Sequence, residues 1–406
     1  MTDTLTYTPL DKCLCCGNKN LTLVLDLHDQ PLANSYPSDI EESEAYYPLA
    51  LNYCNDCTHL QLSVSVDPNL LFKNYLYVSG TTQTLRDYFE KFVNLVQTYI
   101  PYKGPYRVLD IACNDGSQLN AFKSQGHHTY GIDPAENLHI LSSANHTVVC
   151  DYFSKESLDN LKVDTFDIII GQNVFAHNSY PKEFLELCAS KLNSNGRLFI
   201  QTSQADMVKY GQFDTIYHEH ISFFNTLSMA TLANSVNLYL EDVIKTDIHG
   251  TSYVFVLTKD SNHDNTKLCI NKEPKQTLEI VKEFANKSVN VVTKLKDELN
   301  TMKGCYIVGY GAAAKGNTLL NFGEIDLDYI VDDNPLKQGL YTPGRKIKIV
   351  SLDDIIKIAG DRAVVWVPLS WNFFDEIRSR IRDKYFEPTV FVKYFPNMQL
   401  ILESEE

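Results

Sequence analysis

Short β-forming runs alternate with helix-forming stretches through the middle of this 406-residue chain, and this alternation constrains the fold more than any other feature. Four such runs span residues 107–111, 129–132, 166–170 and 197–201. Strands separated by helical stretches predict a parallel sheet covered by helices. The pattern repeats from residue 305, after a polar, helix-favouring stretch. The sequence therefore predicts two α/β domains.

Composition restricts the partners of this chain. Its 36 Lys and Arg against 51 Asp and Glu give a net charge of −15, and no basic stripe offsets this negative field. No apolar run approaches the roughly 18 to 20 residues of a membrane helix, and the polar start lacks a signal-peptide pattern. We expect a globular, cytoplasmic protein, a monomer or small homo-oligomer, that binds neither nucleic acid nor membrane.

Five of the ten cysteines lie before residue 58, and four of them form two CxxC pairs. The pairs are Cys13 with Cys16 and Cys54 with Cys57. Four thiolates in two such knuckles suit tetrahedral Zn²⁺, whereas unrelated cysteines rarely show paired CxxC spacing. Cys15 has the wrong offset for a second knuckle. A closed shell has no open position, so the sequence predicts a structural zinc site.

The motifs VLDIACNDGSQL (108–119) and TYGIDP (129–134) indicate a binding site for S-adenosylmethionine (SAM). A strand ending near Asp110 leads into a turn of small residues, which lets a ligand approach the backbone before a helix begins. A nicotinamide site, the competing interpretation, would favour G-x-G-x-x-G, and here only Gly116 is present. Asp133 ends the next strand, where a carboxylate accepts hydrogen bonds from ribose hydroxyls. The predicted SAM-binding residues are Asp110, Ala112, Asn114, Gly116, Asp133, Pro134, Asp151, Gln172 and Asn173.

The run YHEHISFF (217–224) places a phenol, a carboxylate and two imidazoles in four consecutive positions. Proton-transfer groups beside a methyl donor point to methylation of a carbon acid. In an extended segment Tyr217 and Glu219 would face one way and His218 and His220 the other, so a turn would be needed to bring more of them into one pocket. We expect His218 to be structural. A second metal site using both histidines lacks an obvious third ligand.

A glycine pattern follows the β-run of the last segment, with Asp332 and Asp333 ending the next β-run. The pattern is an imperfect dinucleotide fingerprint, because its last glycine lies five positions after the second, and it does not require NAD. The start of the following helix can instead bind a pyrophosphate. The alternative is a turn that only packs helix on strand. The predicted substrate-binding residues are Gly309, Gly311, Ala312, Lys315 and Gly316.

Taken together, these motifs resemble the SAM-dependent C-methyltransferases of nucleotide-linked 4-keto-6-deoxyhexoses, which typically act at C3. The resemblance rests on the two CxxC pairs, NDG (114–116), GQNVFAH (171–177), YHEHISFF, VGYGAAAKGNT (308–318) and VDDNPLKQGLYTPG (331–344). It implies a zinc module at 1–65, a class I methyltransferase domain of Rossmann-like type at 66–272, a helical linker at 273–303 and a second Rossmann-like domain at 304–406. The last of these would bind the nucleotide sugar.

The resemblance also assigns catalytic roles. His220 would be the base at C3, since an imidazole pKa near ~6.5 suits proton abstraction at neutral pH. Glu219 would orient an imidazole or relay a proton, and Tyr217 would donate to the 4-oxygen of the enolate. His177 and Tyr75 would orient or stabilise the enolate.

Three alternatives remain open at this stage. An O- or N-methyltransferase shares the donor motif but leaves YHEH underused. A nicotinamide oxidoreductase would use the last segment and not the middle one. A noncatalytic zinc-containing binding protein leaves both the donor motif and the polar run unexplained.

Overall fold

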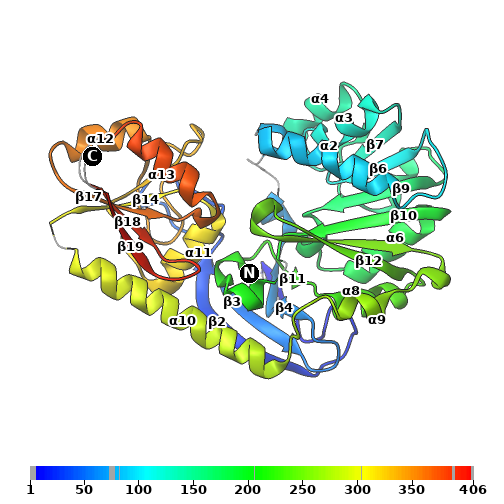
Figure 1. Cartoon of the computed structure of the whole chain (residues 1–406), viewed down its shortest axis with the longest axis horizontal. Coiled ribbons are helices and arrows are strands. Elements are labelled where there is room, and N and C mark those ends of the chain that lie inside the picture. Colours follow the sequence, from blue (N-terminus) through cyan, green and yellow to red (C-terminus); the bar gives the residue numbers. More distant parts are fainter. Residues whose placement is uncertain are drawn as a thin grey trace, which may run out of the picture. The chain divides into compact units, whose positions relative to one another are not determined.

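The structure, a computed structural model, describes residues 6–72, 78–81, 83–204, 206–302, 304–385 and 389–403 (Figure 1). The chain divides into two compact units, each built from separate stretches of sequence. Unit 1 comprises residues 1–22, 52–206 and 219–275, and unit 2 comprises residues 23–51, 207–218 and 276–406. One crossing between the units falls between His218 and Glu219, inside the YHEH run. The domain boundaries expected from the sequence differ from this division and stay predictions.

Unit 1 is built around a seven-stranded sheet in the order β12-β13-β10-β9-β6-β7-β8. Five strands run parallel, and β13 is antiparallel to both of its neighbours, β10 and β12. This order is the Rossmann-like fold of class I methyltransferases, so the α/β prediction is confirmed for this unit. The strands are β6 (Arg107–Ile111), β7 (His128–Ile132), β8 (Thr147–Val149), β9 (Phe166–Gln172), β10 (Leu192–Thr202), β12 (Tyr239–Thr246) and β13 (Ser252–Thr258).

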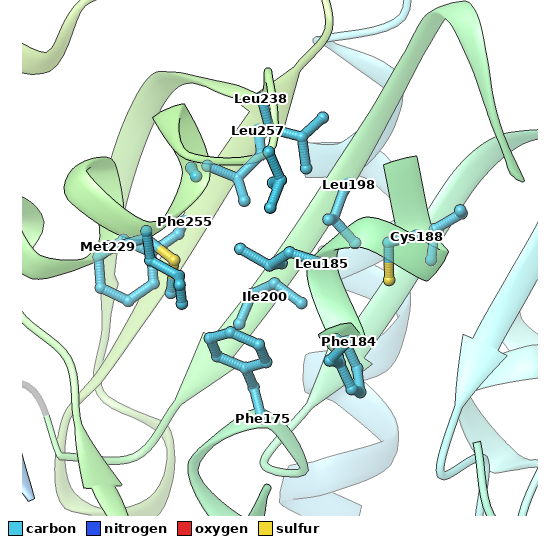
Figure 2. Close-up of a cluster of buried hydrophobic side chains, with 14 of the residues drawn as sticks. Phe175, Phe184, Leu185, Cys188, Leu198, Ile200, Met229, Leu238, Phe255 and Leu257 are labelled. Carbon is cyan, nitrogen blue, oxygen red and sulfur yellow. The ribbon is translucent and has the colours of Figure 1, made fainter. Parts of the chain in front are cut away.

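Helices cover both faces of this sheet because successive strand residues point to opposite sides. Phe199 packs with residues of α2 (Gln83–Gln97) and α3 (Ser117–Ser124) on one face. Leu198 and Ile200 pack on the other face with residues of α6 (Pro181–Lys191) and α8 (Thr226–Asn234). Figure 1 shows α2 and α3 on one side of the strands and α8 on the other, and Figure 2 shows the second core. Each such buried Leu or Phe stabilises the fold by about 1.5 to 3 kcal/mol.

Three further helices of unit 1 lie in two separate segments of the chain, 52–206 and 219–275. They are α4 (Glu136–Ser143), α5 (Lys155–Asn160) and α9 (Thr266–Ile270). In α5 the Ser154 side chain accepts a hydrogen bond from the Ser157 amide at 3.1 Å, a capping box that fixes where the helix begins.

The cysteine-rich start of the chain forms small sheets. β1 (Tyr7–Pro9) pairs with β5 (Val64–Val66), and α1 (Pro68–Phe72) follows. A four-stranded sheet has the order β11-β4-β3-β2. Its strands are β2 (Leu21–Pro31), β3 (Tyr46–Cys54), β4 (Leu60–Leu62) and β11 (Ser222–Phe223). β11 belongs to the YHEHISFF run, so a strand distant in sequence completes a sheet begun by the cysteine segment.

Unit 2 contains a six-stranded sheet in the order β16-β15-β14-β17-β18-β19, in which β19 alone runs antiparallel to its neighbour. This arrangement confirms the expected second Rossmann-like domain. Its strands are β14 (Tyr306–Tyr310), β15 (Tyr329–Val331), β16 (Ile349–Val350), β17 (Val364–Pro368), β18 (Thr389–Lys393) and β19 (Gln399–Glu403). Its helices are α7 (Met207–Tyr210), α10 (Leu278–Thr301), α11 (Ala314–Gly323), α12 (Leu352–Ala359) and α13 (Phe374–Arg382).

The helix expected from the polar stretch before residue 304 is α10, which begins after Thr277, whose side chain accepts a hydrogen bond from the Ile280 amide. Its buried stripe includes Val281, Phe284, Val292 and Leu295. Among the described helices, none is long and apolar enough to cross a membrane.

Candidate active site and zinc centre

A cavity of about 290 Å³ opens at the carboxyl ends of β6, β7 and β9 in unit 1. The chain leaves β6 toward β7 on one side and reaches β9 on the other, so this is the point where the strand order reverses. Ligands of open α/β sheets bind in the crevice outside such a point. Residues at the ends of these strands or directly after them line the cavity: Asp110, Ala112, Asn114, Asp133, Pro134, Gln172 and Asn173.

Two buried carboxylates dominate the polar wall of the cavity. The oxygens of Asp133 accept hydrogen bonds from the backbone amides of Asn114 and Ala135, both at 2.8 Å. Burial raises the pKa of Asp133, and these two hydrogen bonds oppose that shift. Burial, with the charges of Asp133 and Asp115, raises the pKa of Asp110 well above its usual range. The residues named in the cavity lining include no Lys or Arg. Such a wall favours a cationic ligand, as the sulfonium and ammonium groups of SAM are, over a dinucleotide pyrophosphate.

The side-chain oxygen of Asn173 gives a second sign of a polar ligand. This oxygen is buried and has no hydrogen-bond partner among the described residues, although Asn173 lines the cavity. Asn173 also has a left-handed backbone, with φ of 56°, and its amide donates to the Gln201 carbonyl at 2.9 Å. A buried unpaired acceptor is costly unless a ligand satisfies it. The residues present therefore fit SAM.

Two of the predicted SAM-binding residues lie outside the cavity wall. Gly116 has φ of 80° and precedes α3, so its place is the turn itself. Asp151 is exposed, and its carboxylate accepts the Tyr152 amide hydrogen bond at 2.7 Å. The chain turns after β8 so that the next side chains, Tyr152 and Phe153, line the cavity in its place. The predicted role of Asp151 in SAM binding stays a prediction.

Sequence reasoning missed the wall that α2 and the segment before it contribute. Tyr88 and Phe89 line the cavity, and the Tyr88 hydroxyl donates a hydrogen bond to the Gln201 side chain. The one available signal was the amphipathic pattern of residues 83–97, directly before the first strand of the sheet. The Asn114 side chain also accepts the Ser79 amide hydrogen bond at 2.9 Å, so part of its work is to hold this wall.

One imidazole lines the cavity, and a second lies beside it. His177 lines it, in the 3-10 turn η2 (Phe175–His177), and the His220 ring lies 5.1 Å from the His177 ring between centroids. Phe72 stacks on His177 at 5.5 Å and 10°. Burial lowers the pKa of His177 to about 4, so this ring is neutral at pH 7. Tyr75, also predicted for this site, lies outside the described residues.

The YHEH run forms a bend and a turn, not a strand, at residues 217–219. Glu219 and His220, which belong to unit 1, are both 5% exposed, so two titratable side chains are buried here. His218 is buried in unit 2, where its Nε2 lies 3.3 Å from the Tyr47 carbonyl and its ring meets the Tyr47 ring edge-on at 5.8 Å. Tyr217 is partly buried. The geometry of His218 is that of a packing residue.

The four cysteines of the two CxxC pairs converge. Their sulfurs all lie within 4.8 Å of one another, with Cys13 and Cys57 at 3.5 Å and Cys16 and Cys54 at 3.6 Å. Zn²⁺ with four bonds of about 2.3 Å would place sulfurs about 3.8 Å apart, so the group fits the ion. Cys15 is buried but is not one of the four.

The two knuckles share one backbone pattern, which explains why they pair. In each, the first cysteine amide donates to the carbonyl five residues later at 2.8 Å, and the residue four positions on donates back at 2.9 Å. That fourth residue has a left-handed backbone in both knuckles, with φ of 76° at Gly17 and 60° at Thr58. Two like loops thus present their sulfurs symmetrically.

The glycine turn of unit 2 follows β14, and its glycines have different tasks. A side chain added at Gly309 or Gly316 would lie 2.9 Å from Leu327 or Leu369, so these two glycines serve helix and strand packing. Gly311 has φ of 96°, and its amide donates to the Val331 carbonyl at 2.7 Å. The amide of the next residue donates to the Asp332 carboxylate at 2.8 Å. The Gly311 amide is thus already paired with the Val331 carbonyl, and the predicted contact of Gly311 with the substrate stays a prediction.

Lys315, in the first turn of α11, lies in a largely buried group. Its ammonium lies 5.1 Å from the centroid of the Trp371 ring, and burial lowers its pKa against the opposing charge of Asp214. The Asp214 carboxylate is 2% exposed and accepts the Trp371 indole hydrogen bond at 2.6 Å. Asp214 belongs to the turn η3 (Phe213–Thr215), three residues before Tyr217.

Three family models match consecutive parts of the chain. The one described as "Putative zinc binding domain" matches residues 13–72, "Methyltransferase domain" matches 82–243 and "C-methyltransferase C-terminal domain" matches 247–396. C-methyltransferase NovU of Streptomyces niveus is 28% identical over 387 residues, covering 91% of each chain. The chain is a SAM-dependent C-methyltransferase. The zinc module and the use of SAM as methyl donor, both expected from the sequence, are confirmed, whereas the individual SAM-binding residues stay predictions.

Two other similarities cover less of the C-methyltransferase. Ubiquinone biosynthesis O-methyltransferase of Xylella fastidiosa (strain 9a5c) is 26% identical over 171 residues, 37% of this chain and 68% of that one. The crystal structure of PH0226 protein from Pyrococcus horikoshii OT3 matches with a TM-score of 0.36 at 15% identity, over 45% of this chain and 95% of that one. The fold assignment rests on the strand order described above.

Proposed function

We propose that this C-methyltransferase adds a methyl group to C3 of a nucleotide-linked 4-keto-6-deoxysugar, through an enolate, in deoxysugar biosynthesis. One observation carries the proposal: His177 forms part of the donor cavity wall, and the His220 ring lies 5.1 Å from it. A carbon beside a ketone becomes a nucleophile only when a base removes its proton. Imidazoles next to the donor cavity supply such a base where the new bond must form.

In the proposed reaction His220 takes the proton from C3. The electron pair of the broken C–H bond moves toward the 4-carbonyl, and the negative charge develops on its oxygen. SAM, when bound, would supply an electrophilic methyl group: the electron pair of the enolate would form the new bond from C3 to this methyl carbon, and the pair of the broken methyl–sulfur bond would stay on sulfur. Tyr217 donates a hydrogen bond to the enolate oxygen, and Glu219 orients an imidazole or relays the proton. His177, neutral at pH 7, and Tyr75 orient or stabilise the enolate.

The donor contacts follow from the cavity wall. Asp133 retains acceptor capacity beyond its two backbone hydrogen bonds, which suits ribose hydroxyls. Asp110 and the turn through Ala112 and Asn114 would hold the amino acid end. Gln172 and Asn173 lie across the cavity, and Asn173 offers its unpaired oxygen. Pro134 supplies apolar surface, and Gly116 keeps the turn that begins α3.

Unit 2 is the proposed holder of the nucleoside diphosphate. Its sheet reverses order at β14, as the donor sheet does at β6, and α11 begins at that point. Amides of the first helical turn have no acceptor within the helix and are suited to phosphate oxygens. Lys315 adds the positive charge, while Gly311 and Ala312 shape the turn and Gly309 and Gly316 allow its close packing.

The four converging cysteines are the proposed ligands of a structural zinc ion. Cys13, Cys16, Cys54 and Cys57 complete its shell, so no position is open to a substrate.

The test is proton exchange and methyl transfer followed together. The protein is incubated in deuterium oxide with SAM and a panel of nucleotide-linked 4-keto-6-deoxysugars, and the mass and labelled carbon of each product are determined. We expect methyl transfer to one sugar, exchange at C3 and loss of both in His220→Asn. The control is His128→Asn, which replaces an exposed histidine. Exchange at C5 would overturn the assigned carbon, and an active His220→Asn would overturn the base.

The alternative function is O-methylation, which the similarity to ubiquinone biosynthesis O-methyltransferase favours. That similarity covers 37% of the chain, so it does not account for the rest of it. A product carrying its new methyl group on oxygen would decide for this alternative.

A further inference from the structure

The strand that follows the second zinc knuckle pairs with the strand that follows His220. β4 and β11 are antiparallel, with Leu60 opposite Phe223 and Gln61 opposite Ser222. The Leu62 amide continues the ladder by donating to the Ile221 carbonyl at 2.9 Å. The residue next to His220 in the chain is thus bound directly to the cysteine segment.

Ile221 is held from its other side as well. Its amide donates to the Ala176 carbonyl at 2.8 Å, and Ala176 precedes His177. The backbone beside His220 therefore lies between the turn that carries His177 and the strand that leaves the zinc knuckle. Two hydrogen bonds with different partners fix Ile221.

Side chains reinforce the same junction. His59 is completely buried, and its Nε2 shares a hydrogen bond of 3.3 Å with the hydroxyl of Ser222, which is also completely buried. The His59 ring packs on Phe224 at 4.8 Å between centroids. The Asn225 side chain donates to the carbonyl of Thr58 at 3.1 Å. Each of these contacts, like the pairing of β4 with β11, involves a residue within five positions of Cys57, a proposed zinc ligand.

We infer that His59 is a positioning residue for the catalytic base: with Ser222 it fixes the backbone after His220 onto the zinc knuckle, so zinc binding sets the geometry of that base. The inference rests on the proposed role of His220. It gives the zinc module a task in catalysis beyond its own folding. Because a displacement of about 1 Å at a reacting group costs on the order of 100-fold in rate, a loose junction lowers turnover without touching the donor cavity.

The first experiment compares His59→Phe, which keeps an aromatic ring against Phe224, with His59→Gln, which keeps a hydrogen-bonding group near the position of Nε2. We expect kcat to fall about tenfold to 100-fold in His59→Phe. Zinc content, the Kd for SAM and the KM for the acceptor should stay within about twofold of the wild type, and His59→Gln should recover most of the loss. Unchanged kcat in His59→Phe, or loss of zinc or SAM affinity in parallel with kcat, would overturn the inference.

Ser222→Ala removes the same hydrogen bond from the other side with a small change of volume, so the inference stays testable if His59→Phe does not fold. We expect a similar fall in kcat, and no further fall in the double variant, because both changes break one interaction. Amide hydrogen exchange provides a readout other than activity. Peptides covering residues 58–63 and 217–224 should exchange faster in Ser222→Ala, and faster again after zinc is removed, while the donor loop keeps its protection. Unchanged exchange at both peptides would contradict the coupling.

His220→Asn distinguishes failure of this inference from failure of the proposed function. If His220→Asn loses carbon deuteration while Ser222→Ala keeps full kcat, the base stands and the positioning role falls. If His220→Asn still catalyses normal deuterium exchange at the substrate carbon, His220 is not the base, whatever the result for the His59 variants.

Discussion

The imidazole rings of His177 and His220 lie 5.1 Å apart between centroids, tilted by 42°. They come from segments more than 40 residues apart in the chain, and Ile221 bonds directly to the turn that carries His177. Neighbouring, hydrogen-bonded backbone segments thus hold the two rings, and His177 lines the donor cavity. In the proposed reaction, the proton taken up by His220 would lie beside the neutral His177 ring and not beside a second cation. This arrangement predicts coupled effects on mutation.

We expect His177→Asn to lower kcat about tenfold to 100-fold, because the enolate loses a positioned neutral imidazole. In the double variant with His220→Asn, kcat should be no lower than in His220→Asn alone, since residues that act as one unit are not additive. Steady-state kinetics with saturating SAM measures all three. Multiplied losses in the double variant would show that the two rings act independently.

Asp133 offers a test of the donor site. In Asp133→Asn an amide NH2 group replaces one carboxylate oxygen. This group donates and cannot accept the hydrogen bond of the backbone N–H that it faces, so the loop and the ribose hydroxyls both lose an acceptor. Hydrogen bonds to charged groups contribute about 1.5 to 3 kcal/mol, so we expect SAM to bind about tenfold to 100-fold more weakly. Calorimetric titration with SAM gives the Kd. The matched control is Asp151→Asn, exposed and outside the cavity wall, for which the cavity geometry predicts little change. Equal weakening in both variants would show that Asp151 also takes part in SAM binding.

The loop after β6 and the two CxxC knuckles could be predicted from the sequence because each is local, while their roles in binding SAM and zinc stay proposals. One strand, one turn and one carboxylate define the loop, and each zinc knuckle spans six residues. Spacing along the chain therefore carries the information, as it also did for β6, whose predicted and observed bounds agree at residues 107–111.

Relations between distant segments were not predictable in this way. The pairing of β4 with β11 depends on which edge of a small sheet is open, which no single segment specifies. In α10 the apolar Val289 belongs to the expected helix, yet it is 46% exposed, because the buried stripe follows the helical period through Ser288 instead. At Gly311 the sequence showed a flexible turn but not that its amide donates to Val331.

The zinc content of variants distinguishes the four proposed cysteine ligands from Cys15. Cys54→Ser should retain well under ~0.2 zinc per chain and lose secondary structure in the cysteine segment, because three thiolates bind the ion much less tightly than four. Cys15→Ala, also buried but outside the cluster, should keep about one zinc per chain. Metal analysis by mass spectrometry, with circular dichroism, measures both. Zinc loss in Cys15→Ala would revise the ligand set.

Lys315 tests the proposed nucleotide site. In Lys315→Met the charge is removed while much of the buried stem is kept, so the KM for the nucleotide sugar should rise about tenfold, with the Kd for SAM unchanged. The control is Lys357→Met, which replaces an exposed lysine at the end of α12. An unchanged KM in Lys315→Met would leave Lys315 as a partner of Asp214 and Trp371 only, and would favour a turn that packs helix on strand.

The buried His218 predicts an acid-sensitive fold. Burial lowers its pKa to about 4 in the folded protein, whereas an unfolded histidine titrates near ~6.5. Between these values the unfolded chain binds more protons, so stability falls as the pH falls from about 6.5 to about 4. At pH 5 the loss from this one group is on the order of 2 kcal/mol. We therefore expect His218→Gln to be less stable than the wild type at pH 7.5, since it loses ring packing on Tyr47. At pH 5 this difference in stability should become smaller or change sign.

Urea unfolding at the two pH values measures this change for His218→Gln, with His128→Gln, at an exposed histidine, as the control. The control should give the same stability difference from wild type at both pH values. A difference for His218→Gln that does not shrink between pH 7.5 and pH 5 would mean that the imidazole gains its proton without unfolding. In that case His218 would not be the buried, neutral packing residue that its contact with Tyr47 indicates.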